Sequence, residues 1–164
     1  MTDAYEISAD PNRLDVSFVH RWLSQSSYWA LAIPRDVVER AIANSLNFAV
    51  YHASEGQVGY ARVVSDRATF AYLADVFVLD AHRGKGLSKR LMQAVLAHPE
   101  LQGLRRWTLA THDAHGLYEQ CSDIDSNASH GLSEWTGTYN GKRPEIQGRA
   151  GACRAKTIRV PPNL

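Results

Sequence analysis

The segment from Val76 to Met92 constrains the fold most strongly, because an apolar strand pattern leads through a short glycine-rich turn directly into a helical pattern. A helix start leaves several backbone N–H groups without partners and carries a partial positive charge, so it can bind a phosphate group. Gly84 and Gly86 let the backbone come close to such a ligand. The sequence therefore predicts a phosphate-binding loop between a strand and a helix.

Four cations with no acid among them stand in this turn and the start of the helical pattern: Arg83, Lys85, Lys89 and Arg90. Several positive charges suit a ligand with several phosphates better than one with a single carboxylate. The segment is neither a Walker loop nor a dinucleotide-binding fingerprint, because it lacks the glycine spacing of both motifs. We therefore expect a nucleotide-like cofactor of another kind.

From Arg83 onward the segment reads R-x-x-G-x-S, which resembles the R/Q-x-x-G-x-G/A signature of the GNAT superfamily of acyl-CoA-dependent N-acyltransferases. Ser88 stands where that signature prefers Gly or Ala. The resemblance extends from the strand at 70–79 to a second strand at 107–111 and then to the segment 112–120. In the family, this last segment is a helix whose tyrosine faces the sulfur of the cofactor.

The resemblance implies that the loop amides bind the pyrophosphate of acetyl-CoA and that the central strand binds its pantetheine arm. In the family's pattern, a backbone amide of that strand also stabilises the oxyanion of the reaction, and a polar residue near the tyrosine helix contacts the cofactor. The cofactor-binding residues implied in this way are Val76, Phe77, Val78, Arg83, Gly84, Lys85, Gly86, Leu87, Ser88, Lys89 and Asp113. No metal is needed, and His112, Asp113 and His115 are too few ligands for a closed zinc site.

Tyr118 aligns with the general acid of the family, which gives a proton to the departing thiolate of coenzyme A. A phenol is a weaker acid than a thiol, so it performs this step only with help from its surroundings. Without the resemblance, Tyr118 would be read as a core tyrosine with a hydrogen-bonded hydroxyl.

Asp75 is the lone acid in an otherwise apolar strand, which makes it a candidate general base for the amine. Two alternatives stay open, since a lone strand acid can also form a salt bridge or hold an ammonium substrate. Strand alternation places it on the opposite face from Val76 and Val78. Tyr72, Glu119 and a base that acts through water also remain candidates.

The order of patterns predicts a mixed α+β fold with helices on both faces of a central sheet, and the resemblance implies that this sheet is mostly antiparallel. Helices are expected after a cap at Asp15 or Ser17, from Pro34 to Asn47, and after Gly86 with a buried stripe of Leu87, Leu91 and Val95. Strands are expected at 5–8, 48–51, 58–64, 70–79 and 107–111, with a hairpin turn at 54–57.

The chain divides by composition near Cys121, since 60 of residues 1–121 but only 13 of residues 122–164 belong to the apolar set AVILMFWYC. We therefore expect an acetyltransferase core at 1–121 and an atypical segment at 122–164, where only Lys156–Val160 has a strand pattern. The closing strands and Gly-Phe turn of the family are not recognisable there. Either this ending is divergent, or a reading-frame change near codon 121 replaced the original one.

Charge and hydropathy limit the classes of partner that we expect for this chain. Lys and Arg number 18 against 17 Asp and Glu, so a nucleic-acid partner is not expected. The sequence shows neither a signal peptide nor a membrane-spanning run, which predicts a cytoplasmic protein without membrane attachment. Cys121 and Cys153 have the spacing of neither a disulfide framework nor a zinc site, and we expect free thiols.

The function expected from the resemblance is acetyl transfer from acetyl-CoA to a primary amine of a small molecule or peptide, by a monomer or a homodimer. The acceptor is expected near the first two helices, where Trp22, Tyr28, Trp29 and Ile33 cluster, although these side chains are equally suited to a core. The alternative is a non-catalytic acyl-CoA-binding protein that has the same fold.

Overall fold

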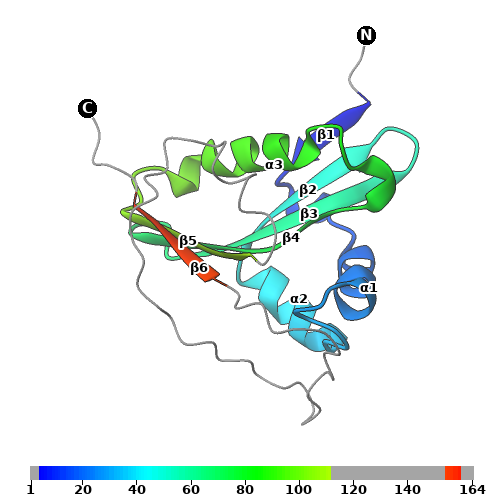
Figure 1. Cartoon of the computed structure of the whole chain (residues 1–164), viewed down its shortest axis with the longest axis horizontal. Helices are drawn as coiled ribbons and strands as arrows, with labels where there is room; N and C mark the ends of the chain where they lie inside the picture. Colours follow the sequence, from blue (N-terminus) through cyan, green and yellow to red (C-terminus); the bar gives the residue numbers. More distant parts are fainter. Residues whose placement is uncertain (1–3, 112–153, 160–164) are drawn as a thin grey trace.

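The computed structural model describes residues 4–111 and 154–159, which form one sheet between two layers of helices (Figure 1). The sheet has six strands in chain order, from β1 (Tyr5–Ser8) to β6 (Arg154–Arg159). Neighbouring strands are antiparallel except β4 (Phe70–Val78) and β5 (Arg106–Thr111), which are parallel. The predicted fold class is confirmed.

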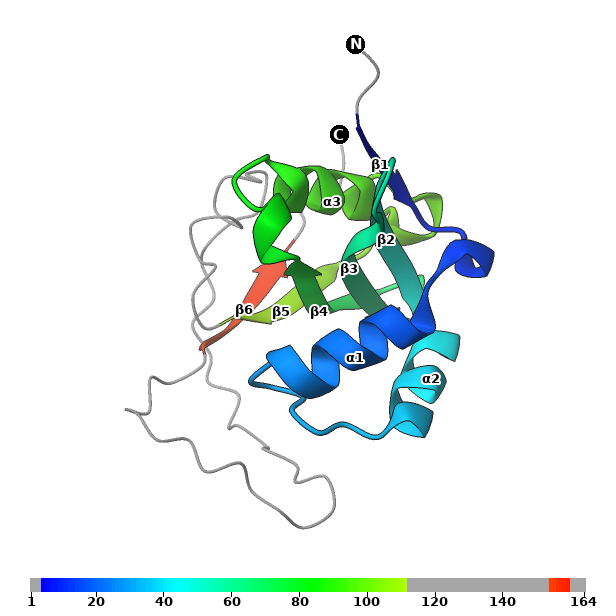
Figure 2. The same ribbon diagram turned by 90° about the vertical axis from the view of Figure 1, so that its right-hand side faces the viewer.

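Helices cover both faces of the sheet (Figure 2). On the first face lie α1 (Val16–Ser26) and α2 (Arg35–Ala43), with a core that includes Phe18, Val19 and Leu23. On the second face lies α3 (Leu87–Leu96), the crossover between the two parallel strands. Its predicted stripe of Leu87, Leu91 and Val95 is buried in the larger core.

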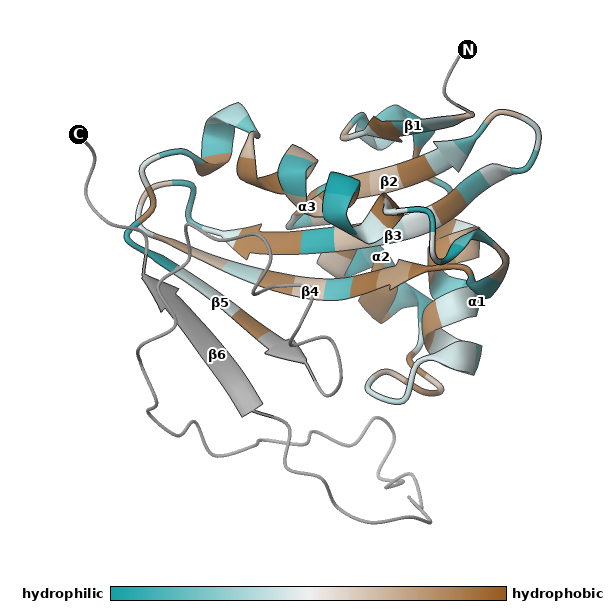
Figure 3. Cartoon of the chain, turned by 45° about the horizontal axis from the view of Figure 1, so that its top comes forward, coloured by the Kyte–Doolittle hydropathy of each residue, from teal (hydrophilic) through white to brown (hydrophobic). Residues whose placement is uncertain are grey.

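The remaining strands form a hairpin between α2 and β4. They are β2 (Leu46–His52) and β3 (Gly56–Ser65), paired antiparallel. Hydrophobic residues recur along β3 and β4, which lie between the helical layers (Figure 3). The turn of the hairpin is at 53–55, so it begins one residue and ends two residues earlier than predicted, and Gly56 begins β3 with φ +75°. Glycine adopts that left-handed conformation without a steric penalty.

The first helix begins as predicted, since the Asp15 side chain accepts a hydrogen bond of 2.9 Å from the Phe18 amide. The predicted end of the second helix at Asn47 is wrong, because α2 stops at Ala43. The Asn47 side-chain amide donates to the carbonyl oxygens of Ile42 and Ser45, 2.9 and 3.0 Å away. It thereby satisfies carbonyl groups where the chain turns from helix to strand.

In the parts of the chain that the structure describes, the helices are too short and too polar to cross a bilayer.

The turn between β3 and β4 is held by Asp66. One carboxylate oxygen accepts hydrogen bonds from the amides of Ala68, Thr69 and Phe70, at 3.0, 2.8 and 3.0 Å. The other accepts from the Thr69 hydroxyl. The Thr69 hydroxyl and these backbone donors lower the pKa of Asp66 well below its ordinary value of 3.8.

We expect Asp66→Ala to lower the melting temperature at about pH 7, because the folded state stabilises the ionised carboxylate. A lowered pKa in the folded state contributes stability above the ordinary value of 3.8, and this contribution is lost as the pH falls through the folded pKa. The difference between wild type and variant should therefore shrink by about pH 2.5. Thermal unfolding at both pH values measures it.

Asp66→Asn is the matched control, because it keeps a hydrogen-bond acceptor and removes the charge. Its loss of stability at about pH 7 should be smaller, and its difference from wild type should shrink at low pH by about the same amount as that of Asp66→Ala, because both variants lack the titrating carboxylate. A constant difference between Asp66→Ala and wild type at both pH values would contradict this account of the turn.

Candidate functional site

The parallel strands β4 and β5 pair over only four residues of β4. The register runs from Phe70 opposite Arg106 to Leu73 opposite Leu109, and no pairing of β4 with β5 follows. Residues 74–78 of β4 therefore have an edge that β5 does not cover. Backbone groups on such an edge can bind an extended ligand as an added strand would.

A bulge interrupts β4 at the point where it leaves β5. The register with β3 shifts there, so that Asp75 and Val76 both stand opposite Ala61. Asp75 has φ +52°, a left-handed conformation that Asp tolerates better than most residues. Because of the extra residue, Leu73 and Val78 pack in the same core under α3 although five positions separate them.

The side chains after the bulge point to the two faces in turn. Val76 and Val78 pack on the side of α3, whereas Phe77 packs on the side of α1 and stacks on Trp22 with ring centroids 3.8 Å apart. The predicted placement of Asp75 opposite Val76 and Val78 is confirmed, since Asp75 contacts Trp29 from the loop after α1. The side chains of Val76, Val78 and Phe77 pack in the core, so a ligand can bind only the backbone groups of these residues.

The turn after β4 leads into an uncapped helix start. Gly84 and Gly86 have φ +75° and +72°, and a Cβ atom at either position would meet nothing within 4 Å. Glycine is therefore required by the backbone conformation rather than by crowding. Gly86 is the N-cap of α3, and no side chain of the described residues caps the helix, so the amides of its first turn can bind an anion.

The cations of the turn have partners that their spacing did not predict. Arg83 forms a 3.0 Å ion pair with Asp80, which precedes the cation cluster, and its Nε donates to the Val78 carbonyl oxygen at 3.2 Å. The Lys85 ammonium donates to the Tyr5 hydroxyl at 2.8 Å. Lys89 is exposed on the first turn of α3. Arg83 and Lys85 are thus anchored at the cradle, which we define as residues 83–89.

Tyr5 of β1 contacts the residues on both sides of this cradle. Arg90 donates to the backbone carbonyl of Tyr5 at 3.1 Å, and the Tyr5 hydroxyl lies 2.9 Å from Nδ1 of the buried His82. Glu55 of the hairpin turn lies 3.4 Å from the other nitrogen of the same ring. Sequence reasoning missed Tyr5, because nothing in the sequence indicates a contact between segments about eighty residues apart.

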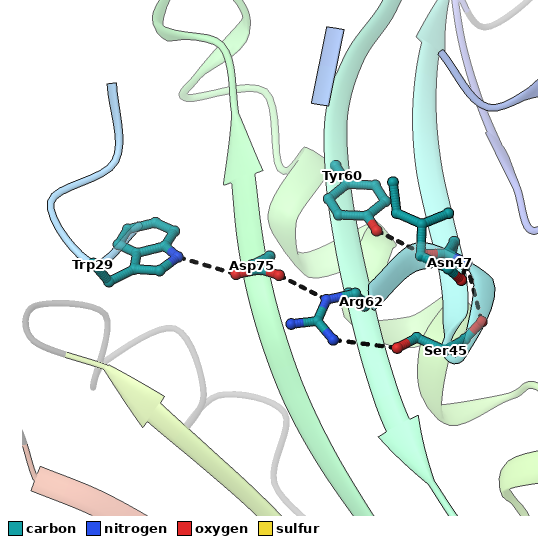
Figure 4. A network of polar contacts seen from close by, with 7 residues as sticks. Trp29, Ser45, Asn47, Tyr60, Arg62 and Asp75 are labelled. Atoms are coloured by element: carbon teal, nitrogen blue, oxygen red, sulfur yellow. Dashed lines mark hydrogen bonds and ion pairs between the residues drawn. The ribbon is translucent and has the colours of Figure 1, made fainter. Parts of the chain in front are cut away.

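A second polar group lies on the other face of β4, where Asp75 joins an ion pair and a tryptophan (Figure 4). Its Oδ2 accepts from Nε of Arg62 at 2.7 Å, and its Oδ1 accepts from Nε1 of Trp29 at 3.1 Å. The side chains of Arg62 and Asp75 are 18% and 14% exposed. Of the roles left open for Asp75, the salt bridge is the one that the structure contains, and its role as base stays a prediction.

The neighbouring Tyr60 is buried and donates its hydroxyl proton to Oδ1 of Asn47 at 2.6 Å. Burial raises the pKa of Tyr60, so the phenol stays protonated at neutral pH. It therefore contributes no charge beside Arg62.

This polar group forms one corner of a cavity of about 120 Å³ between the sheet and the first two helices. Trp29 and Ile33 line the cavity, as the sequence suggested for an acceptor pocket. Trp22 instead belongs to the core against Phe77, and Tyr28 is 55% exposed beside Trp29. Apart from Arg62 and Asp75, the residues that line the cavity are apolar or aromatic.

The predicted general acid Tyr118 and the predicted cofactor contact Asp113 lie outside the described residues, as do His112 and His115. Within residues 4–111 and 154–159, no three His, Cys, Asp or Glu side chains are grouped so that they could hold a metal ion.

Comparisons with known proteins agree with this geometry. The model of the acetyltransferase (GNAT) family matches residues 16–122. A solved structure from Xanthomonas campestris pv. campestris, assigned as a GNAT acetyltransferase, is 55% identical, covers 73% of this chain and 83% of its own, and has a TM-score of 0.70.

A protein of Gibberella zeae assigned as an acetyltransferase is 31% identical, over 70% of this chain and 75% of its own. N-acetylglutamate synthase from Neisseria gonorrhoeae, solved with coenzyme A and L-arginine, has the same fold. It is 14% identical, the alignment covers 95% of this chain and 33% of that chain, and the TM-score is 0.64.

We expect Gly86→Ala to weaken acetyl-CoA binding, because a side chain at φ +72° is strained by about 1–2 kcal/mol and shifts the helix start. Gly103→Ala is the matched control. Gly103 has φ +71° and equal open space, but it precedes β5 at the opposite end of the parallel pair. Calorimetric titration should show weaker binding for Gly86→Ala only, and equal affinities would contradict the location of the cradle.

We expect Asp75→Asn to lower the free energy of unfolding by about 2 kcal/mol, because it leaves the Arg62 guanidinium largely buried without its counter-ion. Asparagine keeps the tolerance for positive φ and an acceptor for Trp29. Denaturant unfolding measures the change.

The matched control for Asp75→Asn is Glu100→Gln, which also replaces an acid by the amide of the same side-chain length. Glu100 pairs with Arg67 at 2.9 Å with both side chains about half exposed, and its loss should cost no more than about 0.5 kcal/mol. Equal destabilisation by the two substitutions would show that burial does not strengthen the Arg62–Asp75 pair.

Proposed function

Because the chain belongs to the acetyltransferase (GNAT) family, we propose that it is an N-acetyltransferase that transfers the acetyl group of acetyl-CoA to a primary amine. One observation carries the proposal. The start of α3, where no described side chain caps the helix, follows the β4 edge that β5 does not cover through the turn at 79–86, so one ligand with a phosphate end and an extended arm can use both.

In this proposal the cradle amides from Gly84 to Lys89 bind the pyrophosphate, and Arg83 and Lys85 add positive charge. Backbone groups of residues 76–78 bind the pantetheine arm along the edge that β5 leaves open. The fit rests on this chain's own features, which are the missing side-chain cap at Gly86 and the open space at both glycines.

The transfer requires a neutral amine, a donor for the oxyanion and a proton for the departing thiolate. The amine nitrogen bonds to the thioester carbonyl carbon, the carbon–sulfur bond breaks, and the sulfur takes a proton. We assign the oxyanion donor to the β4 backbone near Phe77 and Val78, and the proton to the Tyr118 hydroxyl. Both assignments follow the family's pattern at the matching positions of this sequence.

We place the acceptor amine in the cavity beside Asp75, since the bulge belongs to the same strand whose edge binds the arm. Asp75 as the base that removes the amine proton remains a proposal. Its two carboxylate oxygens already accept from Arg62 and Trp29, so a proton transfer to it would compete with one of these hydrogen bonds.

We expect Tyr118→Phe to lower kcat by about a hundredfold, because the thiolate then leaves without a general acid. The affinity for acetyl-CoA should stay unchanged, since the hydroxyl acts on the leaving group only. Thiol release with a panel of primary amines measures the rate, and calorimetry measures the affinity.

Tyr51→Phe is the matched control, because the Tyr51 hydroxyl donates to the backbone of Arg13, away from the cradle. An unchanged kcat in Tyr118→Phe would remove Tyr118 from the mechanism. Binding of acetyl-CoA without transfer to any amine of the panel would instead support the non-catalytic acyl-CoA-binding protein.

A further inference from the structure

The polar corner of the cavity, which consists of Trp29, Arg62 and Asp75, has one set of hydrogen-bonding groups left over. Arg62 uses Nε on Asp75 and Nη1 on the Ser45 hydroxyl, 2.7 and 3.2 Å away. No partner of its Nη2 is found among the described residues (Figure 4). Since a guanidinium carries five N–H donors, Nη2 has two donors available.

The carboxylate of the corner is occupied in a different way. Each Asp75 oxygen already accepts one hydrogen bond, one of them from a cation. The pair of Arg62 and Asp75 is neutral as a whole, so the corner does not attract an ammonium group by net charge. The hydrogen-bonding groups that remain in the corner are N–H donors of the Arg62 guanidinium. They bind an oxygen acceptor, and a carboxylate is the acceptor that they bind most strongly.

The rest of the cavity determines which group the ligand carries beside its carboxylate. The side chains of Leu23, Ile33, Val38 and Ile42 line it, and together with their neighbours they offer no charge. At about 120 Å³ it has room for several non-hydrogen atoms, given that one water needs about 10–15 Å³ of such space. An aliphatic group of a few carbon atoms fits these walls.

We propose that Arg62 determines acceptor specificity, with Nη2 binding a carboxylate of an amine acceptor whose aliphatic group fills the cavity. The acceptor class is then a small aliphatic amino acid. The assignment of this ligand as an acceptor rests on the proposed function, whereas binding of the carboxylate at the corner does not. Asp75 acts as a positioning residue that fixes the guanidinium through Nε, and Trp29 fixes Asp75 in turn.

The binding test uses the full-length protein with coenzyme A and follows the Trp29 indole N–H signal by NMR, assigned with Trp29→Phe. The probe is 4-methylpentanoate, which is L-leucine without its amino group. We expect this carboxylate to shift the Trp29 signal in the wild type and not in Arg62→Gln. The matched control Arg67→Gln removes an exposed arginine paired with Glu100 and should respond as the wild type does.

A shift caused by 3-methylbutylamine, which is L-leucine without its carboxylate, in place of the acid would overturn the proposal and assign ammonium binding to Asp75. No shift with either compound would overturn it as well. Because this readout needs no turnover, its outcome is independent of whether the protein transfers acetyl groups. Binding in wild type that persists in Arg62→Gln would also contradict the role of Arg62.

The kinetic test compares kcat/KM for L-leucine and 3-methylbutylamine. We expect the wild type to favour L-leucine by at least about tenfold, as a hydrogen bond to a charged group allows, and Arg62→Gln to lose that preference through KM. The affinity for acetyl-CoA checks that the variant is folded. An equal preference in wild type and Arg62→Gln would overturn the proposal.

Discussion

The short pairing of β4 with β5 is the constraint on which the rest of the structure depends. A parallel pair needs a crossover, and α3 supplies it after the turn at 79–86 that follows β4. The uncapped start of the helix therefore lies at the same end of the sheet where β4 parts from β5. If the two strands stayed paired to their ends, the helix start would remain but the edge beside it would be covered.

The bulge at Asp75 lets one strand serve two sites. By adding a residue, it keeps Val76 and Val78 in the core under α3 while Asp75 and Phe77 face α1. The edge of β4 then faces the proposed cofactor, and the Asp75 side chain faces the cavity. Burial of two charges there is tolerated because Arg62 and Asp75 pair with each other and with further hydrogen-bonding groups.

Local patterns predicted most of the elements, because periodicity and caps act within a few residues. The cap at Asp15, the buried stripe of α3 and the strand at 70–79 followed from such signals. The end of α2 did not, since Leu46 fits the helical period as well as the strand that it begins. The bulge could not be predicted from an apolar strand sequence. One extra residue changes which face of the sheet a side chain is on, but it does not change the hydrophobicity of the residues.

Contacts between distant segments explain the rest of what was missed. Arg62 on β3 reaches Asp75 on the neighbouring strand β4, and Tyr5 reaches Lys85 and His82 from the N-terminal strand β1. The most direct test of the account is hydrogen–deuterium exchange of the wild type with and without acetyl-CoA. We predict slower exchange in peptides that cover residues 76–78 and 84–89 and no change at 99–105. Binding of acetyl-CoA without slower exchange in those two segments would contradict the account.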